Sequence, residues 1–185
     1  MTMEAGQASE FLAEVERVQR NVRRSVLYRH ASAMLMLWGC VTSVGYTATY
    51  LYPTAANTIW LVLGGTGLLA SVVLGLVSSW RRSGVNTFDA RSAAAFVVFV
   101  GFGIVWSVWL GQFTPRQLSA FWPSYFMLPY IMSGLWLGRA LVLIGVGVVA
   151  LTALGYAYAG SLFLPWMALV NGGGLLLGGA WMRRN

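Results

Sequence analysis

The feature that most constrains this chain is a series of apolar stretches that are each about 20 residues long and carry arginine near their ends. A helix rises 1.5 Å per residue, so such a stretch crosses roughly 30 Å of hydrocarbon. Because a backbone in lipid must satisfy its own hydrogen bonds, each stretch is expected to be a helix. The sequence predicts an all-α domain over residues 31–185 with six transmembrane helices. The expected spans are residues 32–52, 58–80, 93–113, 118–137, 140–159 and 162–182.

Composition favours a membrane protein over a soluble one. The 185 residues are 58% hydrophobic and only 9% charged, whereas about a quarter of a soluble domain is charged. The net charge of +7 is compatible with nucleic-acid binding. However, the basic residues lie at the ends of the apolar stretches, where they set membrane orientation, so no nucleic-acid partner is expected.

The arginines predict the orientation. All twelve basic residues are arginine. If the N-terminus lies in the cytosol, only Arg116 falls on the outer side. The other eleven then face the cytosol: Arg17, Arg20, Arg23, Arg24, Arg29, Arg81, Arg82, Arg91, Arg139, Arg183 and Arg184. This distribution follows the positive-inside rule and predicts cytosolic N- and C-termini.

Residues 1–30 are expected to form a basic, amphipathic cytosolic helix before the first span. Its apolar residues recur at steps of three and four, which places them on one helix face. The contact residues expected in this segment are Phe11, Val15, Val18 and Val22 on the apolar face, with Arg17, Arg20, Arg23 and Arg24 supplying charge. The segment is interpreted as an anchor on anionic lipid headgroups, or as a docking helix for a partner protein or a second copy.

Residues that commonly carry chemistry are missing from the spans. No Asp, Glu, Arg, Lys or His falls in the middle of a predicted span, although such groups mark most proton relays and ion-coupled pumps. A single histidine, His30, and a single cysteine, Cys40, offer too few ligands for a metal site. Cys40 is expected to be a packed, inert thiol. We therefore expect no catalytic residue, no metal ligand and no cofactor.

Two places inside the spans are candidates for a ligand site or a helix break. Pro129 removes a backbone hydrogen bond, so the helix over 118–137 is expected to kink or to be interrupted. Asn171 is followed by Gly172, Gly173 and Gly174, which weaken the helix around a buried amide. This run is interpreted as a broken helix that presents backbone groups to a substrate, or as a close helix contact in which Asn171 bonds a neighbouring helix. Hydroxyl side chains elsewhere in the spans are expected to bond their own helices.

The final stretch runs from Trp166 through Asn171-Gly-Gly-Gly to Gly178-Gly-Ala-Trp-Met-Arg-Arg184. This pattern, together with the basic segment that leads into the first span, resembles small six-span bacterial inner-membrane proteins with no assigned activity. The resemblance covers the general plan of the chain. It implies location in a bacterial inner membrane and supplies no functional residues.

Three functions are compatible with these observations. The first is a non-enzymatic interaction or regulatory protein, whose helices anchor the basic N-terminal segment against membrane lipid or against a cytosolic or membrane protein partner. The second is a transport or substrate-binding component for a small neutral or apolar molecule, with a pocket near Pro129 and Asn171. The third is a homo-oligomeric channel.

Overall fold

The computed structural model describes residue 14, residues 31–80 and residues 90–184. Within these ranges the secondary structure is entirely helical, which confirms the predicted all-α class. The N-terminal contact residues predicted between Phe11 and Arg24 lie outside the described residues, as does His30.

From residue 31 onward, six helical segments make up the described part of the chain, and we call them crossings because each runs along the length of the bundle. The first three are Ala31–Leu51, then η1 (Pro53–Ala55) with α2 (Ala56–Trp80), then α3 (Ala90–Ile104) with the π-helical turn η2 (Val105–Leu110). The next two are α4 (Pro115–Leu137) and α5 (Arg139–Tyr158). The last consists of η3 (Gly160–Leu162), α6 (Phe163–Met167), the π-helical turn η4 (Ala168–Gly173) and α7 (Gly174–Arg184).

Four helices are long and apolar enough to cross a membrane, as expected of a membrane protein. They are Ala31–Leu51, Pro53–Val77, Arg139–Tyr158 and Gly160–Arg184. Ala94–Leu110 is a shorter apolar helix, and α4 is not among the four. The structure therefore supports a membrane-spanning chain and, by length and apolarity, four of the six predicted spans.

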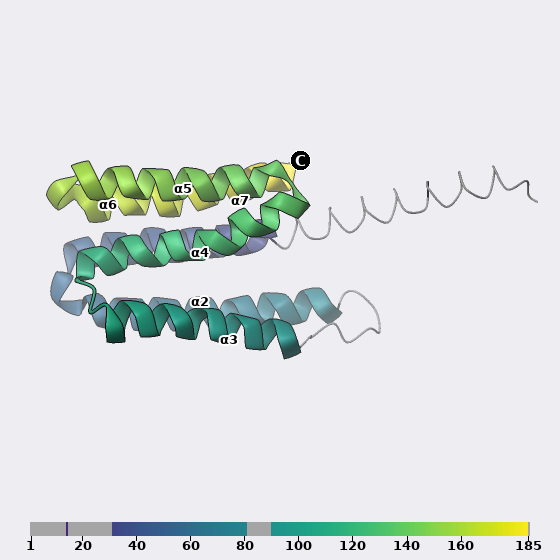
Figure 1. Ribbon diagram of the computed structural model, residues 1–185, viewed down its shortest axis with the longest axis horizontal. Helices are drawn as coiled ribbons and strands as arrows, with labels where there is room; N and C mark the ends of the chain where they lie inside the picture. Colours follow the sequence, from purple (N-terminus) through teal and green to yellow (C-terminus); the bar gives the residue numbers. More distant parts are fainter. Residues whose placement is uncertain (1–13, 15–30, 81–89, 185) are drawn as a thin grey trace, which may run out of the picture.

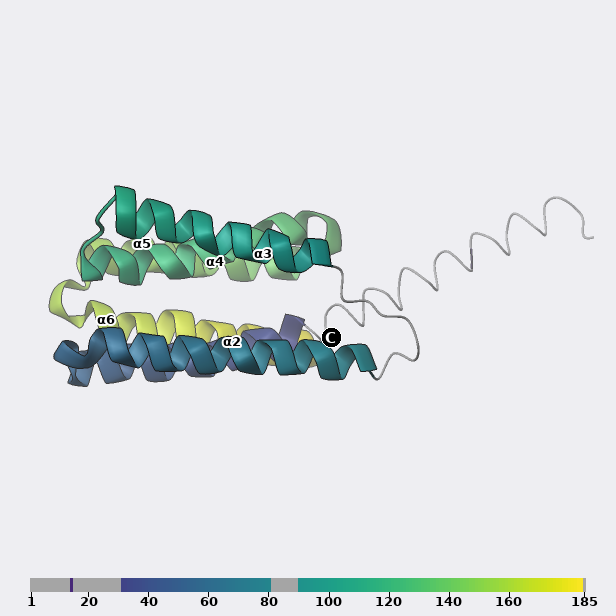
Figure 2. The ribbon, with the colours of Figure 1, turned by 90° about the horizontal axis from the view of Figure 1, so that it is seen from below.

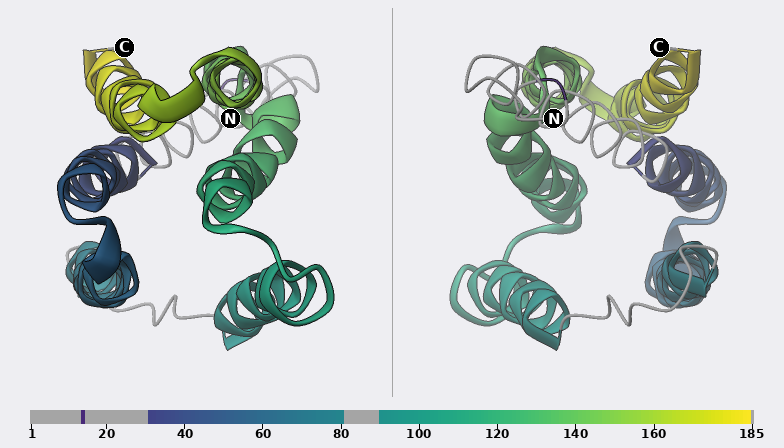
Figure 3. Two further views of the ribbon diagram at one scale, coloured as in Figure 1. Left: turned by 90° about the vertical axis from the view of Figure 1, so that its left-hand side faces the viewer. Right: turned by 90° about the vertical axis from the view of Figure 1, so that its right-hand side faces the viewer.

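The helices form two layers (Figures 1 and 3). One layer holds α2, the Ala31–Leu51 helix and the α6–α7 crossing, and the other holds α3, α4 and α5. The view from below places α2 on one side of the molecule and α3 on the other (Figure 2). The chain thus begins with two helices in the first layer and continues through α3, α4 and α5 in the second. It then returns to the first layer with α6 and α7.

The Ala31–Leu51 helix is tied to three others by hydrogen bonds. The indole Nε1 of Trp38 donates to the hydroxyl of Ser71 in α2 at 3.2 Å. The hydroxyl of Tyr46 donates to the carbonyl of Ser119 in α4 at 2.9 Å, and Ser32 donates to the carbonyl of Gly179 in α7 at 2.6 Å. This helix therefore holds its own layer together and also joins it to the second layer.

Packing around the first helix divides into an inner and an outer cluster. The inner cluster joins Leu35 to Met127, Leu175 and Met182, the residue before Arg183. The outer cluster is built on Tyr46 and Met167, which is fully buried. Cys40, expected to be packed, is instead exposed on the surface of the first helix.

Candidate functional site

The two sequence candidates inside the spans lie on different helices. Pro129 is half-buried in α4, which continues as one α-helix from Pro115 to Leu137 through both of its internal prolines. Asn171 lies in η4, where the last crossing widens into a π-helical turn and then resumes as α7. The glycine run therefore widens the helix without breaking it, since the chain continues directly into α7.

The glycines after Asn171 have different surroundings. A β-carbon added at Gly172 meets Ser43 of the first helix, with Cα of Ser43 only 2.8 Å away. One added at Gly173 meets nothing within 4 Å, and one at Gly174 makes ordinary contact with Val148 at 3.7 Å. Gly172 is therefore the residue of this run that allows the first and last crossings to approach closely, as the packing interpretation expects.

Asn171 does not make the hydrogen bond that close packing leads one to expect. Its side chain is 2% exposed, and its Oδ1 has no partner among the described residues. The hydroxyl Oγ1 of Thr152 in α5 is also buried and without a described partner. Helix α5 packs against η4, so both unpaired oxygens lie on elements that contact each other.

Thr152 differs from most of the buried hydroxyl residues in the described helices. Thr42, Ser71 and Ser107, for example, donate to the carbonyl four residues earlier in their own helices. Such a bond removes the cost of burying a hydroxyl. Because Thr152 does not make one, it is a buried polar group whose position calls for another explanation.

A groove of about 400 Å³ lies between α4 and α5, and we call it the α4–α5 groove. Its lining is mostly apolar. Nine residues line it: Phe113, Gln117, Ala120, Phe121 and Ser124 from α4 and the turn before it, and Val149, Thr152, Ala153 and Tyr156 from α5. Thr152 therefore belongs to this groove, whereas neither Pro129 nor Asn171 lines it.

Local sequence explains why the helices separate at this end. At the other end, Gly134 lies so close to α5 that an added β-carbon comes within 2.7 Å of the Val142 backbone nitrogen. Gly138, at φ 143°, makes the turn between the helices in a conformation that favours glycine. Toward Phe113 and Tyr156, small residues such as Ala120 and Ala153 line the interhelical space, which leaves the groove.

One wall of the groove is aromatic. Phe121 is stacked on Tyr125 with ring centroids 5.1 Å apart, and Tyr125 is stacked on Phe99 of α3 at 4.2 Å. Phe113 meets Phe121 edge to face at 5.4 Å. Because each ring is held by the next, the side of the groove formed by Phe121 is a fixed apolar surface.

Arg116 contacts Tyr156, one of the residues that line the groove, and we call this end the mouth of the groove. Its Nη2 donates to the carbonyl of Tyr156 at 2.9 Å, and the guanidinium lies over the Tyr156 and Phe163 rings at 5.2 and 5.4 Å. The Tyr156 carbonyl belongs to the last turn of α5, where carbonyls lack helical donors and a cation is favoured. Arg116 therefore ties the start of α4 to the end of α5.

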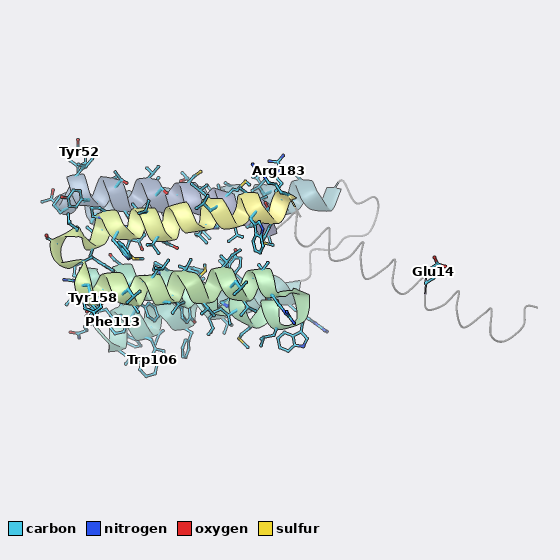
Figure 4. The ribbon with its side chains drawn as sticks, turned by 90° about the horizontal axis from the view of Figure 1, so that it is seen from above. Glu14, Tyr52, Trp106, Phe113, Tyr158 and Arg183 are labelled. Atoms are coloured by element: carbon cyan, nitrogen blue, oxygen red, sulfur yellow. The ribbon has the colours of Figure 1, made fainter. Side chains whose placement is uncertain are left out.

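Figure 4 shows the level of this site in the bundle. Phe113 and Tyr158 lie near one end of the helices, as does Tyr52, while Arg183 lies toward the other end. The groove thus opens near the end of the bundle opposite to the C-terminal arginine pair.

The sequence did not point to Thr152 or to the groove. A threonine in an apolar helix is unremarkable as a pattern, and only the absent hydrogen bond in the fold distinguishes it. Arg116 did stand out, as the one arginine expected on the outer side. Among the described residues, no three side chains of histidine, cysteine, aspartate or glutamate gather as a metal site.

Comparisons of this chain with protein-family models, with curated proteins and with solved structures found no match. The site must therefore be interpreted from its own residues.

Proposed function

We propose that this chain is a six-span, non-enzymatic protein of a bacterial inner membrane, with both termini in the cytosol, and that it belongs to the interaction or regulatory class. In this proposal the helical domain anchors the basic N-terminal segment, which meets anionic lipid or a partner protein. The observation that carries the proposal is the position of charge. Arg139, Arg183 and Arg184 lie at helix ends, and no Asp, Glu, Lys, Arg or His lies between Arg139 and Arg183.

The orientation is tested with reporter fusions. Alkaline phosphatase is active only outside the cytosol, and green fluorescent protein fluoresces when it folds in the cytosol. We expect a fusion after Asn185 to fluoresce and a fusion in the turn at Thr54 to show phosphatase activity. Phosphatase activity after Asn185 would contradict the proposed topology.

The role of the N-terminal segment is tested by affinity capture from native membranes. The full chain is compared with a chain that lacks residues 1–28, and with a chain in which Arg17, Arg20, Arg23 and Arg24 are changed to glutamate. We expect a defined set of proteins or anionic lipids to be captured by the full chain alone. If all three chains capture the same set, the segment is not a docking element.

A second candidate function is binding or transport of a small neutral or apolar molecule, and the α4–α5 groove favours it. The groove is mostly apolar and its lining includes the polar residues Gln117, Ser124 and Thr152, which matches sites that combine apolar walls with a few polar groups. The experiment compares Thr152→Val with Asn171→Ala in ligand binding. A loss in Thr152→Val alone places the ligand in the groove, and a loss in Asn171→Ala alone moves it to η4.

A further inference from the structure

We propose that the α4–α5 groove binds a single phospholipid, with its phosphate at Arg116 and one acyl chain between the two helices. This inference rests on the second candidate function and names the ligand for it. It does not depend on the role of the N-terminal segment. Three features of the groove, taken from its mouth inward, support a phospholipid.

The mouth of the groove is suited to a phosphate. Arg116 is exposed, and its guanidinium has five N–H donors, of which the described structure uses one for the Tyr156 carbonyl. It also lies in the first turn of α4, where the helix dipole is positive. The acidic side chains of the chain are Glu4, Glu10, Glu14, Glu16 and Asp89, all distant in sequence from this turn. A phosphate therefore complements the charge at this end of the groove.

Thr152 lies at the depth of a lipid ester. It is four residues from Tyr156 along α5, which places it about 6 Å, or one helical turn, farther into the bundle. The glycerol backbone of a phospholipid sets its first ester carbonyl at a comparable depth below its phosphate. A threonine hydroxyl is a donor that rotates to suit its partner. Thr152 lines the groove, but its Oγ1 has almost no accessible surface. In this proposal the side chain rotates on lipid binding, and an ester carbonyl then accepts the hydrogen bond from Oγ1.

The inner part of the groove is suited to an acyl chain. Ala120 and Ala153 leave space between the helices, and Phe121 and Val149 add apolar surface. Phe121 is held by its stacking on Tyr125. A flexible hydrocarbon chain fills such a channel without requiring further polar partners. Phosphate, ester and acyl chain thus follow the order of Arg116, Thr152 and the apolar lining.

The experiment is native mass spectrometry of the full chain in detergent, titrated with phosphatidylglycerol. Ala153→Phe fills the groove and leaves Arg116 unchanged, and Ala150→Phe is the control, because Ala150 is exposed on the same helix outside the groove. We expect Ala153→Phe to weaken binding of the first lipid by at least about tenfold, and Ala150→Phe to bind like the wild type.

The charge is tested separately, because Arg116 also ties α4 to α5. Arg116→Gln is expected to weaken binding of phosphatidylglycerol about tenfold, while Arg116→Lys keeps most of it through its positive charge. Thr152→Val is expected to lose about threefold. Diacylglycerol, which has the ester and acyl groups without the phosphate, should bind the wild type more weakly and be insensitive to Arg116→Gln.

Two results would overturn the inference, and only the second would also remove support for the second candidate function. If diacylglycerol binds as well as phosphatidylglycerol and Arg116→Gln affects neither, the phosphate assignment is wrong while the apolar groove remains a binding site. If Ala153→Phe and Ala150→Phe bind both lipids like the wild type, the groove holds no lipid. In that case the second candidate function also loses its supporting site.

Discussion

At the scale of single residues, the presence or absence of one methyl or hydroxyl group decides how the helices fit. Gly172 and Gly173 are neighbours in sequence, yet only Gly172 faces the backbone of the first helix. Thr152 and Asn171 each bury an oxygen without a described partner, on elements that pack together. Glycine, threonine and asparagine are all ordinary residues in membrane helices. Their effect on packing at these positions is set by the neighbouring helix that each one meets.

Gly172→Ala is expected to destabilise the protein by about 1–3 kcal/mol, because the added methyl group overpacks the contact with Ser43. Gly173→Ala is the matched control, since its methyl group enters open space. The measurement is the unfolding midpoint in a detergent titration. Equal midpoints for the two variants would show that the first and last crossings do not approach as described.

Thr152→Val is expected to leave the stability of the lipid-free protein unchanged or to raise it, because it removes a buried hydroxyl that has no described partner. Ser32→Ala provides the comparison. It breaks a 2.6 Å bond to the Gly179 carbonyl and is expected to cost about 1 kcal/mol. Thermal unfolding in detergent distinguishes them, and a marked loss in Thr152→Val would mean that its hydroxyl has a stabilising partner.

At the scale of helices, α3 depends on α4 for its place in the second layer. Many of its large apolar side chains are exposed, including Phe96, Val97 and Val98. Its described attachments include aromatic stacking, the hydrogen bond from the Tyr125 hydroxyl to the Phe99 carbonyl at 2.9 Å, and the close approach of Gly103 to Trp122. The same Tyr125 supports Phe121 in the groove wall, so attachment of α3 and the shape of the groove are linked.

Tyr125→Phe is expected to keep the stacking but lose the bond to Phe99, which is worth about 0.6 kcal/mol on average between membrane helices. Hydrogen exchange of residues 94–110 should then accelerate roughly threefold. Tyr158→Phe is the control, because Tyr158 is 84% exposed. Unchanged exchange in Tyr125→Phe would show that stacking alone holds α3.

At the scale of the whole molecule, the first helix joins the two layers. Trp38 donates to Ser71 in α2, and its ring is stacked with Phe126 of α4 at a centroid distance of 6.3 Å. Gly67 of α2 also lies close enough to Trp38 that an added β-carbon comes within 3.3 Å of the indole. Loss of this side chain therefore affects three helices at once.

Trp38→Ala is expected to destabilise the bundle by about 2–4 kcal/mol, because a large half-buried side chain is removed from between helices. Trp109→Ala is the control, since Trp109 is 76% exposed. The measurement is the half-life of the folded protein in detergent at a fixed temperature. Similar half-lives for both variants would contradict the joining role of Trp38.

The sequence by itself determined the apolar stretches and the all-α class. A backbone in lipid must satisfy its hydrogen bonds internally, and a helix is the structure in which a single apolar stretch does so. The sequence also identified Arg116 as exceptional, through its position among twelve arginines. Only the tertiary structure decided that α4 continues through Pro123 and Pro129, and that Ala168–Gly173 forms a π-helical turn. It also decided that Thr152 Oγ1 has no hydrogen-bond partner among the described residues. The physical reason is that these properties depend on which helices meet and at what distance. Side chains from α4 and α5 form the groove, and no pattern within either helix specifies the space between them.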